Sequence, residues 1–421
     1  NLCWCPVKEN TGKELDEMNI LFMTLLNIYD INEHTIYTDL LREFIKHGDS
    51  VYIVSPTERK NHEETRIIKL HNCIILKPRI GNVQKTNLIE KGFSTITLEG
   101  QIKKAIKHYY SNVKFNLVLY STPPITLTSV IEYIKKRDAA RTYLLLKDIF
   151  PQNSVDLGIL SVTGWKSILY KYFRNKEKKL YALSDQIGCM SQANVDYVIK
   201  HNPEVKTSRV EVCPNSIEVK DKSITYDERN ALRTKYGIPL DRIVFVYGGN
   251  LGKPQGIPFI IKCLKACKGI TNAYFLIVGD GTEYGKLAEF INDDKPENVK
   301  LMRCLPKDEY DHMIASCDVG LIFLDYRFTI PNFPSRLLSY IQAGLLVLAA
   351  TDTVTDIGKV IVDGGFGWWC ESNDVDKFVQ FVKIAIMEDL TLKKSAAVKY
   401  LEDYYSTGES YKIIVGAKEN E

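Results

Sequence analysis

The sequence has no apolar run long enough to cross a membrane. Its longest candidates, residues 20–26 and 345–350, have the length of strands, whereas a spanning helix needs about 20 residues. A secretory signal is missing too, because residues 1–17 are polar and carry acids where a signal has a basic segment and an apolar stretch. We therefore expect no membrane-spanning segment, and we interpret residues 1–17 as an N-terminal extension or a remnant of expression.

The sequence also has no large excess of positive or negative charge, and its cysteines are not closely paired. The 55 Lys and Arg residues face 52 Asp and Glu residues, and the net charge of +3 argues against a nucleic-acid binder. The 10 cysteines are scattered and none forms a CxxC pair. Cys263 and Cys267 share a helix face, but no His or Cys cluster accompanies them, so we expect no metal site there. Buried, reduced thiols of a cytoplasmic protein are the favoured interpretation.

What remains is the composition of a globular protein, with 45% hydrophobic and 25% charged residues over a length typical of two domains. From Met18 onward, short apolar runs alternate with helical patterns. This alternation predicts βαβ units, a parallel sheet and right-handed crossovers. In the first half we expect strands at 19–26, 50–54, 117–120 and 143–146, and helices at 35–47 and 125–137.

The alternation restarts after residue 215. We expect strands at 243–247, 273–278, 299–302, 319–323 and 346–349, and helices at 257–266, 307–315 and 335–343. The fold class is thus α/β, with two doubly wound, Rossmann-like domains over residues 18–215 and 216–390 that face a cleft. We expect a C-terminal helix at about 391–417 to pack back on the first domain. Such sheets bind ligands outside the carboxyl ends of their strands, so the cleft is the natural site.

A glycine-rich segment, residues 248–253 (GGNLGK), follows one of these strands and precedes a helix. We call it the glycine turn. Glycines allow a ligand to approach the backbone closely, the helix start offers free N–H groups, and Lys253 adds a cation. Together they favour a diphosphate site, although a tight turn without a ligand explains the spacing equally well. The match to the dinucleotide fingerprint GxGxxG is poor, so nothing indicates hydride transfer.

A second loop ends at another helix start, where Pro334 suits the first turn and Ser335 and Arg336 stand where an anion would be held. An arginine can bind phosphate oxygens with two parallel hydrogen bonds. The alternative is a capped helix with an exposed arginine. Two such helix starts in one domain favour a ligand that carries a diphosphate and further groups, such as a nucleotide-sugar.

Residues 165–181 form a basic segment with six Lys or Arg residues, one Glu, and apolar and aromatic residues among them. A basic helix of this kind can lie on an anionic membrane surface. A solvated helix that packs through its aromatic side is the alternative.

Eight segments carry a resemblance to a known family. They are 38–48 (TDLLREFIKHG), 51–56, 147–158 (KDIFPQNSVDLG), 184–191 (SDQIGCMS), 212–217 (VCPNSI), 247–256 (YGGNLGKPQG), 277–281 (IVGDG) and 334–344 (PSRLLSYIQAG). In this order they resemble the GT-B glycosyltransferases of family 4, in particular the bacterial capsule and O-antigen enzymes related to fucosaminyl transferases. The resemblance extends over nearly the whole chain from Met18.

The resemblance implies transfer of a hexosyl or N-acetylhexosaminyl group from a nucleotide-sugar, with a UDP-sugar favoured, and with retention at the anomeric carbon. It implies neither a metal nor another cofactor, and a saccharide acceptor that is lipid-linked. The enzyme would be cytoplasmic and peripheral at the inner face of the membrane. The implied catalytic residues are Lys147, Asp148, Lys253 and Arg336, the donor-binding residues are Gly249, Asn250, Gly252, Gly279, Arg303, Ser335 and Ser339, and His34 lies on the acceptor side.

The chain departs from the broad family at several of these places. Pro331 and Ser339 stand where the family has two glutamates, and Asn250 and Gln255 stand where it tends to have Arg and Lys. Lys147 replaces a histidine that many relatives place before the cleft-facing aspartate. Lys147 and its neighbouring aspartate could contact a substrate or could only orient their loop.

Two alternatives share the fold. A nucleotide-sugar 2-epimerase would need acid and base groups in the cleft, and the matching loops hold few. A catalytically inactive scaffold that binds nucleotide-sugars would explain the missing glutamates.

Overall fold

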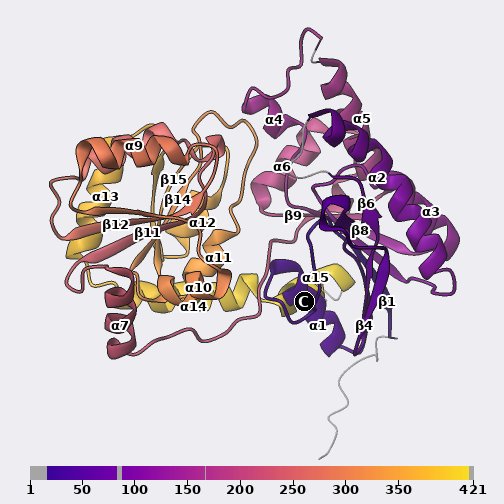
Figure 1. Cartoon of the computed structure of the whole chain (residues 1–421), viewed down its shortest axis with the longest axis horizontal. Helices are drawn as coiled ribbons and strands as arrows, with labels where there is room; N and C mark the ends of the chain where they lie inside the picture. Colours follow the sequence, from indigo (N-terminus) through magenta and orange to yellow (C-terminus); the bar gives the residue numbers. More distant parts are fainter. Residues whose placement is uncertain (1–16, 83–87, 166, 417–421) are drawn as a thin grey trace, which may run out of the picture.

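The computed structural model describes residues 17–82, 88–165 and 167–416. The expected N-terminal extension therefore lies outside the described residues, apart from Glu17. Two α/β domains lie side by side, and the chain crosses from the first to the second once before its C-terminal helices (Figure 1). No helix among the described residues is long and apolar enough to cross a membrane.

The first domain contains an eight-stranded sheet with the order β10-β9-β8-β7-β1-β2-β5-β4. Its strands are β1 (Asn19–Met23), β2 (Ser50–Val54), β4 (Arg66–Leu70), β5 (Cys73–Lys77), β7 (Leu117–Ser121), β8 (Arg141–Leu146), β9 (Gln186–Cys189) and β10 (Val210–Val212). All neighbours are parallel except β4, which pairs antiparallel with β5. A short parallel pair, β3 (Thr57–Glu58) and β6 (Arg79–Ile80), stands apart. Strand β7 is buried along its length, because helices cover both faces.

Helices cover the two faces of this sheet unequally. One face packs against α2 (Leu88–Tyr109), α3 (Thr128–Asp138), α5 (Ser167–Leu183) and α6 (Gln192–His201), and the short α4 (Gln152–Asp156) follows β8. The other face packs against α1 (Ile36–Lys46). Thr35 caps α1: its hydroxyl accepts a hydrogen bond from the Thr38 amide, which fixes where this helix begins.

The second domain contains a six-stranded parallel sheet with the order β13-β12-β11-β14-β15-β16. Its strands are β11 (Ile243–Asn250), β12 (Ala273–Asp280), β13 (Val299–Met302), β14 (Val319–Phe323), β15 (Leu346–Thr351) and β16 (Gly367–Glu371). One face is covered by α8 (Ile257–Ala266), α9 (Tyr284–Asp294) and α13 (Val375–Met387). The other is covered by α7 (Tyr226–Tyr236), α10 (Lys307–Ala315), α11 (Arg336–Gln342), α12 (Ile357–Asp363) and α14 (Thr391–Tyr405). The expected fold class, two doubly wound domains that face a cleft, is confirmed.

The C-terminal segment is not one helix. It breaks at Ser406, whose hydroxyl accepts from the Glu409 amide and begins α15 (Thr407–Val415). Helix α14 packs on α11 in the second domain, whereas α15 packs on α1 in the first, as Figure 1 shows. The Tyr411 ring stacks on His47 at 3.9 Å, so the chain end fastens the two domains together.

The cysteines follow the expectation from composition. The eight described cysteines are free thiols, and all but Cys304 are buried. Burial raises the pKa of the Cys73 thiol to about 12, which keeps it protonated and unreactive.

Candidate active site

A cleft of about 1210 Å³ lies between the two domains. The first domain lines it with the loops that follow β1, β7 and β8, and the second with the glycine turn and the loop that leads into α11. The crossover between the domains, residues 215–224, also contributes to its lining. The cleft is therefore at the carboxyl ends of both sheets, where such sheets bind ligands.

The glycine turn leaves β11 with an unusual backbone. Gly249 has a φ of +130°, which L side chains rarely adopt. A Cβ placed on Gly249 would lie 3.4 Å from Nη2 of Arg336, so the start of α11 reaches this turn. Tyr247 stabilises the turn, because its hydroxyl donates to the carbonyl of Asn250 at 2.6 Å. The two candidate anion sites of the second domain thus meet in one place.

Arg336 is the cation at this meeting point. Its guanidinium carbon lies 4.5 Å from the centre of the Tyr247 ring, and its Nη1 is buried without a hydrogen-bond partner. A buried donor without an acceptor costs free energy unless a ligand supplies the acceptor. Because Arg336 lines the cleft, an anionic group of a substrate can supply it.

The structure brings seven of the twelve candidate residues to the cleft. They are His34, Lys147, Asp148, Gly249, Ser335, Arg336 and Ser339. Asn250, Gly252, Lys253, Gly279 and Arg303 are not among the residues that line it.

Local contacts explain why three residues of the glycine turn do not line the cleft. Lys253 begins a 3-10 turn over Lys253–Gln255 and is exposed to solvent. The Asn250 amide lies 3.3 Å from Gln255 Oε1, and the Gly252 amide donates to the same oxygen at 3.1 Å. Gln255 therefore satisfies groups that were expected to face the donor, and it lines the cleft itself.

Gly279 and Arg303 have other roles. A Cβ on Gly279 would lie 1.9 Å from the carbonyl oxygen of Gly249, so this glycine allows β11 and β12 to pack closely. Arg303 forms an ion pair with Asp280 at 2.5 Å and lies 3.6 Å from the centre of the Tyr284 ring. These contacts hold its guanidinium outside the cleft lining.

Lys147 and Asp148 follow β8 on the wall of the first domain. Both backbone amides donate to Thr122 Oγ1, at 3.1 and 3.2 Å, which fixes the loop. Burial lowers the pKa of Lys147 to about 8. Burial also raises the pKa of Asp148 to about 6, although a hydrogen bond from the Asn153 amide at 2.8 Å opposes the shift. Both groups therefore change charge close to neutral pH, as acid and base groups of active sites often do.

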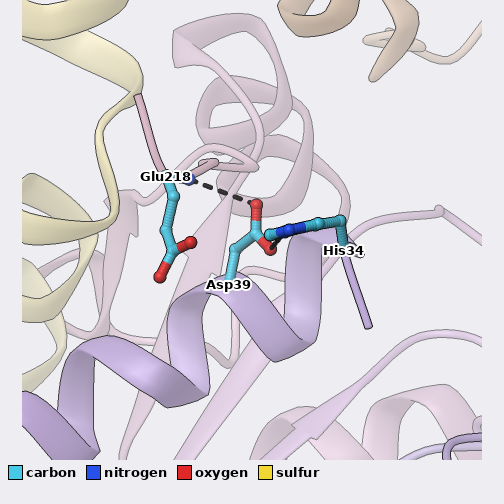
Figure 2. Close-up of side chains that lie close together, drawn as sticks. All are labelled: His34, Asp39 and Glu218. Carbon is cyan, nitrogen blue, oxygen red and sulfur yellow. Dashed lines mark hydrogen bonds and ion pairs between the residues drawn. The ribbon is translucent and has the colours of Figure 1, made fainter. Parts of the chain in front are cut away.

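His34, Asp39 and Glu218 all line the cleft, and their side chains lie close together (Figure 2). Ligating atoms of the three lie within 4.8 Å of one another, a spacing that could hold a metal ion. Arg42, however, forms ion pairs with Asp39 and with Glu218, the latter at 2.9 Å. It also holds the pKa of Glu218 down to about 2. Since both carboxylates are already neutralised, we interpret the cluster as an ion-pair network that joins α1 to the crossover.

Sequence reasoning missed the basic residues of the crossover. Lys220 Nζ lies 3.1 Å from His34 Nε2, and Lys222 donates to Asp311 at 2.9 Å. Lys307 donates to the same carboxylate at 3.1 Å. All of them line the cleft, but they come from segments without a recognisable motif, so only the tertiary structure brings them together.

The two domains also touch on the other side of the cleft. The hydroxyl of Thr329 donates to Asp156 at 2.8 Å, and the Asn194 amide donates to the Pro331 carbonyl at 2.7 Å. Apolar residues of both domains pack beside these contacts, among them Ile149 and Phe328. The two domains are thus joined both here and through the C-terminal helices.

Comparisons with known proteins point to one kind of enzyme. Residues 228–400 match the family described as "Glycosyl transferases group 1". The chain is 24% identical over 293 residues to "Probable glycosyltransferase WbjE" of Pseudomonas aeruginosa, which covers 69% of this chain and 71% of that protein. It is 20% identical over 285 residues to "Putative colanic acid biosynthesis glycosyl transferase WcaI" of Escherichia coli K12, which covers 66% and 68%.

Solved structures show the same fold over almost the full chain. Sucrose-phosphate synthase of Thermosynechococcus elongatus aligns with a TM-score of 0.72 at 14% identity and covers 96% of this chain and all of that one. HepE of Anabaena, in complex with UDP-glucose, aligns with a TM-score of 0.65 at 13% identity and covers 95% and 99%. Residues 228–400 thus resemble the glycosyl transferases group 1 family, and nearly the whole chain shares the GT-B fold of these solved structures.

Proposed function

We propose that this chain is a retaining, metal-independent glycosyltransferase that transfers a sugar from a nucleotide-sugar to a lipid-linked saccharide in surface polysaccharide assembly. One observation carries the proposal most: the partnerless, buried guanidinium nitrogen of Arg336, which lies beside the glycine turn in the cleft. The name of WcaI refers to colanic acid biosynthesis, which supports a polysaccharide product. We further propose that the chain belongs to the capsule and O-antigen branch of family 4.

In this reaction the bond between the anomeric carbon and the donor diphosphate breaks, and a new bond forms to an acceptor hydroxyl oxygen. The hydroxyl proton passes to the departing phosphate. Negative charge develops on the diphosphate as the bond breaks, and preorganised donors stabilise it. Arg336 supplies a full positive charge for this purpose, while Ser335 and Gly249 lie next to it in the lining.

Lys147 and Asp148 serve the acceptor side. The Asp148 carboxylate accepts a hydrogen bond from the incoming hydroxyl, and the Lys147 ammonium attracts an anionic group of either substrate. His34 lies farther along the same wall and contacts the acceptor saccharide.

The activity should show a bell-shaped dependence on pH. Asp148 ionises as the pH rises through about 6, and Lys147 loses its charge as the pH rises through about 8. We therefore expect kcat/KM to rise between about pH 5 and 7 and to fall above about pH 8. In Asp148→Asn the overall rate should drop and the acidic limb should disappear. A full acidic limb in that variant would exclude Asp148 as its source.

The donor is proposed to be a UDP-sugar that carries a hexosyl or N-acetylhexosaminyl group. A bound ligand raises stability by mass action, so a thermal-shift screen of nucleotide-sugars should single out the donor. The same donor, incubated with lipid-linked saccharides, should transfer its sugar. Isomerisation of the donor without an acceptor would instead indicate an epimerase, and tight binding without turnover a scaffold.

We also propose that the first domain docks on the inner face of an anionic membrane, where a lipid-linked acceptor resides. Six apolar side chains around the start of α5, which we call the apolar tip, are exposed: Ile159, Val162, Trp165, Ile168, Leu169 and Tyr172. Trp165 is 81% exposed and Ile168 is 74% exposed. Leu157, close to the tip in the chain, lines the cleft, so lipid at the tip would be near the site.

Charge supports the same orientation. Helices α2, α3 and α5 cover one face of the first sheet and carry twelve basic (Lys or Arg) against five acidic residues. This excess of seven positive charges exceeds the net charge of +3 of the whole chain. Several lysines of the basic segment already have partners: Lys176 pairs with Glu99 at 3.6 Å, and Lys179 with Glu132 at 3.3 Å. The exposed apolar groups, rather than these lysines, should therefore contribute most to binding.

The double variant Trp165→Ser, Ile168→Ser should reduce sedimentation with phosphatidylglycerol vesicles at least fivefold, because burial of large apolar side chains in lipid is lost. Met387→Ser is the matched control, since Met387 is 87% exposed on the second domain. Its vesicle binding should match the wild type. Equal sedimentation of the double variant and the control would refute docking through the apolar tip.

A further inference from the structure

Arg336 differs from the fully buried arginine of its domain, Arg233. Arg233 is fully buried and forms an ion pair with Asp318 at 2.7 Å. No ion pair joins Arg336 to a carboxylate among the described residues, and its Nη1 is without a hydrogen-bond partner. Something other than an acid must therefore hold its guanidinium at the glycine turn.

The ring of Tyr247 is one group that can do so. The guanidinium carbon of Arg336 lies 4.5 Å from its centre, within the range of a cation–π contact. Such a contact orients a cation without neutralising it, because the ring carries no net charge. A carboxylate in the same place would hold the arginine equally well but would cancel the charge that a diphosphate needs.

Tyr247 also fixes the other half of the site. Its hydroxyl donates to the carbonyl of Asn250 at 2.6 Å and so fastens the glycine turn. The side chain is fully buried in β11, where its ring lies 6.0 Å from that of Phe323. One rigid side chain therefore contacts both the guanidinium and the turn.

We propose that Tyr247 is a positioning residue that presents the uncompensated charge of Arg336 to the leaving diphosphate. This inference rests on the proposed function. It adds that a cation on α11, Arg336, takes the place of the Arg and Lys that the family tends to have at positions 250 and 255. The aromatic face orients the guanidinium, whereas the hydroxyl donates to the Asn250 carbonyl. We therefore expect loss of the ring to weaken diphosphate binding more than loss of the hydroxyl.

Titration calorimetry with UDP and with inorganic pyrophosphate tests this role. Tyr247→Phe keeps the ring and should bind both probes within threefold of the wild type. Tyr247→Leu removes the ring and should weaken both at least tenfold. In an Arg336→Ala background, the same Tyr247→Leu change should weaken binding less than twofold further, since its effect acts through the guanidinium.

Phe245→Leu is the matched control for the loss of a buried aromatic ring, because Phe245 lies in the same strand and is fully buried. It should lower the melting temperature like Tyr247→Leu but leave both affinities unchanged. Unchanged affinity in Tyr247→Leu, or an equal loss with and without Arg336, would overturn the positioning role alone. A wild-type protein that binds neither probe would overturn the proposed function and this inference with it.

Discussion

Replacing Arg336 by alanine should lower kcat/KM by about 100- to 1000-fold, which corresponds to about 2.7–4 kcal/mol of transition-state stabilisation. The reason is that the guanidinium lines the cleft beside Gly249 and its Nη1 has no hydrogen-bond partner, while the charge of the diphosphate grows as the donor bond breaks. Affinity for the nucleotide should fall at least tenfold, or about 1.4 kcal/mol. Steady-state kinetics and calorimetry with the donor identified by thermal shift provide both values.

Arg303→Ala is the matched control for this experiment. It removes the same group from the same domain, but Arg303 pairs with Asp280 outside the cleft lining. Its kcat/KM should stay within about threefold of the wild type, because an exposed ion pair contributes little. The phosphate assignment would be wrong if the two alanine variants lost activity to the same extent, or if Arg303→Ala alone lost it.

Replacing Arg233 by methionine should destabilise the second domain by about 3–5 kcal/mol, because it leaves a buried carboxylate without its cation. The Arg233 side chain donates to Asp318 at 2.7 Å, to the Ser316 carbonyl at 2.8 Å and to the Pro239 carbonyl at 2.9 Å. These contacts fasten α7 to the segments that lead into the starts of β11 and β14. Urea unfolding followed by tryptophan fluorescence and circular dichroism measures the loss.

Arg229→Met is the corresponding control. Arg229 contacts the same carboxylate at 3.2 Å, but its side chain is 26% exposed, so its loss should cost about 1 kcal/mol or less. Similar unfolding midpoints for Arg233→Met and the wild type would show that the buried pair does not stabilise this domain.

Much of the fold follows from local patterns. The expected helix at 257–266 and the expected strand at 299–302 have the bounds of α8 and β13. Helix α8 is buried on the side that its apolar pattern marks, and a pattern of this kind needs no knowledge of distant residues. The antiparallel pair of β4 and β5 was not predicted. Strand β4 is the edge strand and none of its residues is buried, so its sequence carries no clear alternation of apolar and polar residues.

The C-terminal segment shows a second limit of prediction from local sequence patterns. A single helix at about 391–417 was expected, whereas Ser406 ends α14 and caps α15. The break allows α15 to reach α1 across the domain boundary, a contact that no local propensity encodes. The break is stabilised by packing that depends on the position of both domains.

For the candidate site, the structure brings the expected loops to the cleft but not all of the expected side chains. Gly249 and Arg336 were expected to act together, and the structure places them next to each other. Lys253 was placed at the diphosphate because it follows glycines, yet the 3-10 turn points it to solvent. The direction of a side chain at a loop depends on backbone angles, which residue spacing does not determine.

The role of Tyr247 had no signal in the sequence either. In the sequence, Tyr247 resembles any other apolar residue of a buried strand. Its ring contacts Arg336 only because α11, almost ninety residues later, packs beside this strand. Long-range contacts of this kind decide which cation is free for a ligand and which is neutralised.

The most direct measurement is a crystal structure of the protein with bound UDP. We expect the β-phosphate at the glycine turn, with at least one oxygen within about 3 Å of the Arg336 guanidinium. A diphosphate bound away from this turn, or an Arg336 that stays without a phosphate contact in the occupied cleft, would contradict the role of this domain in sugar transfer.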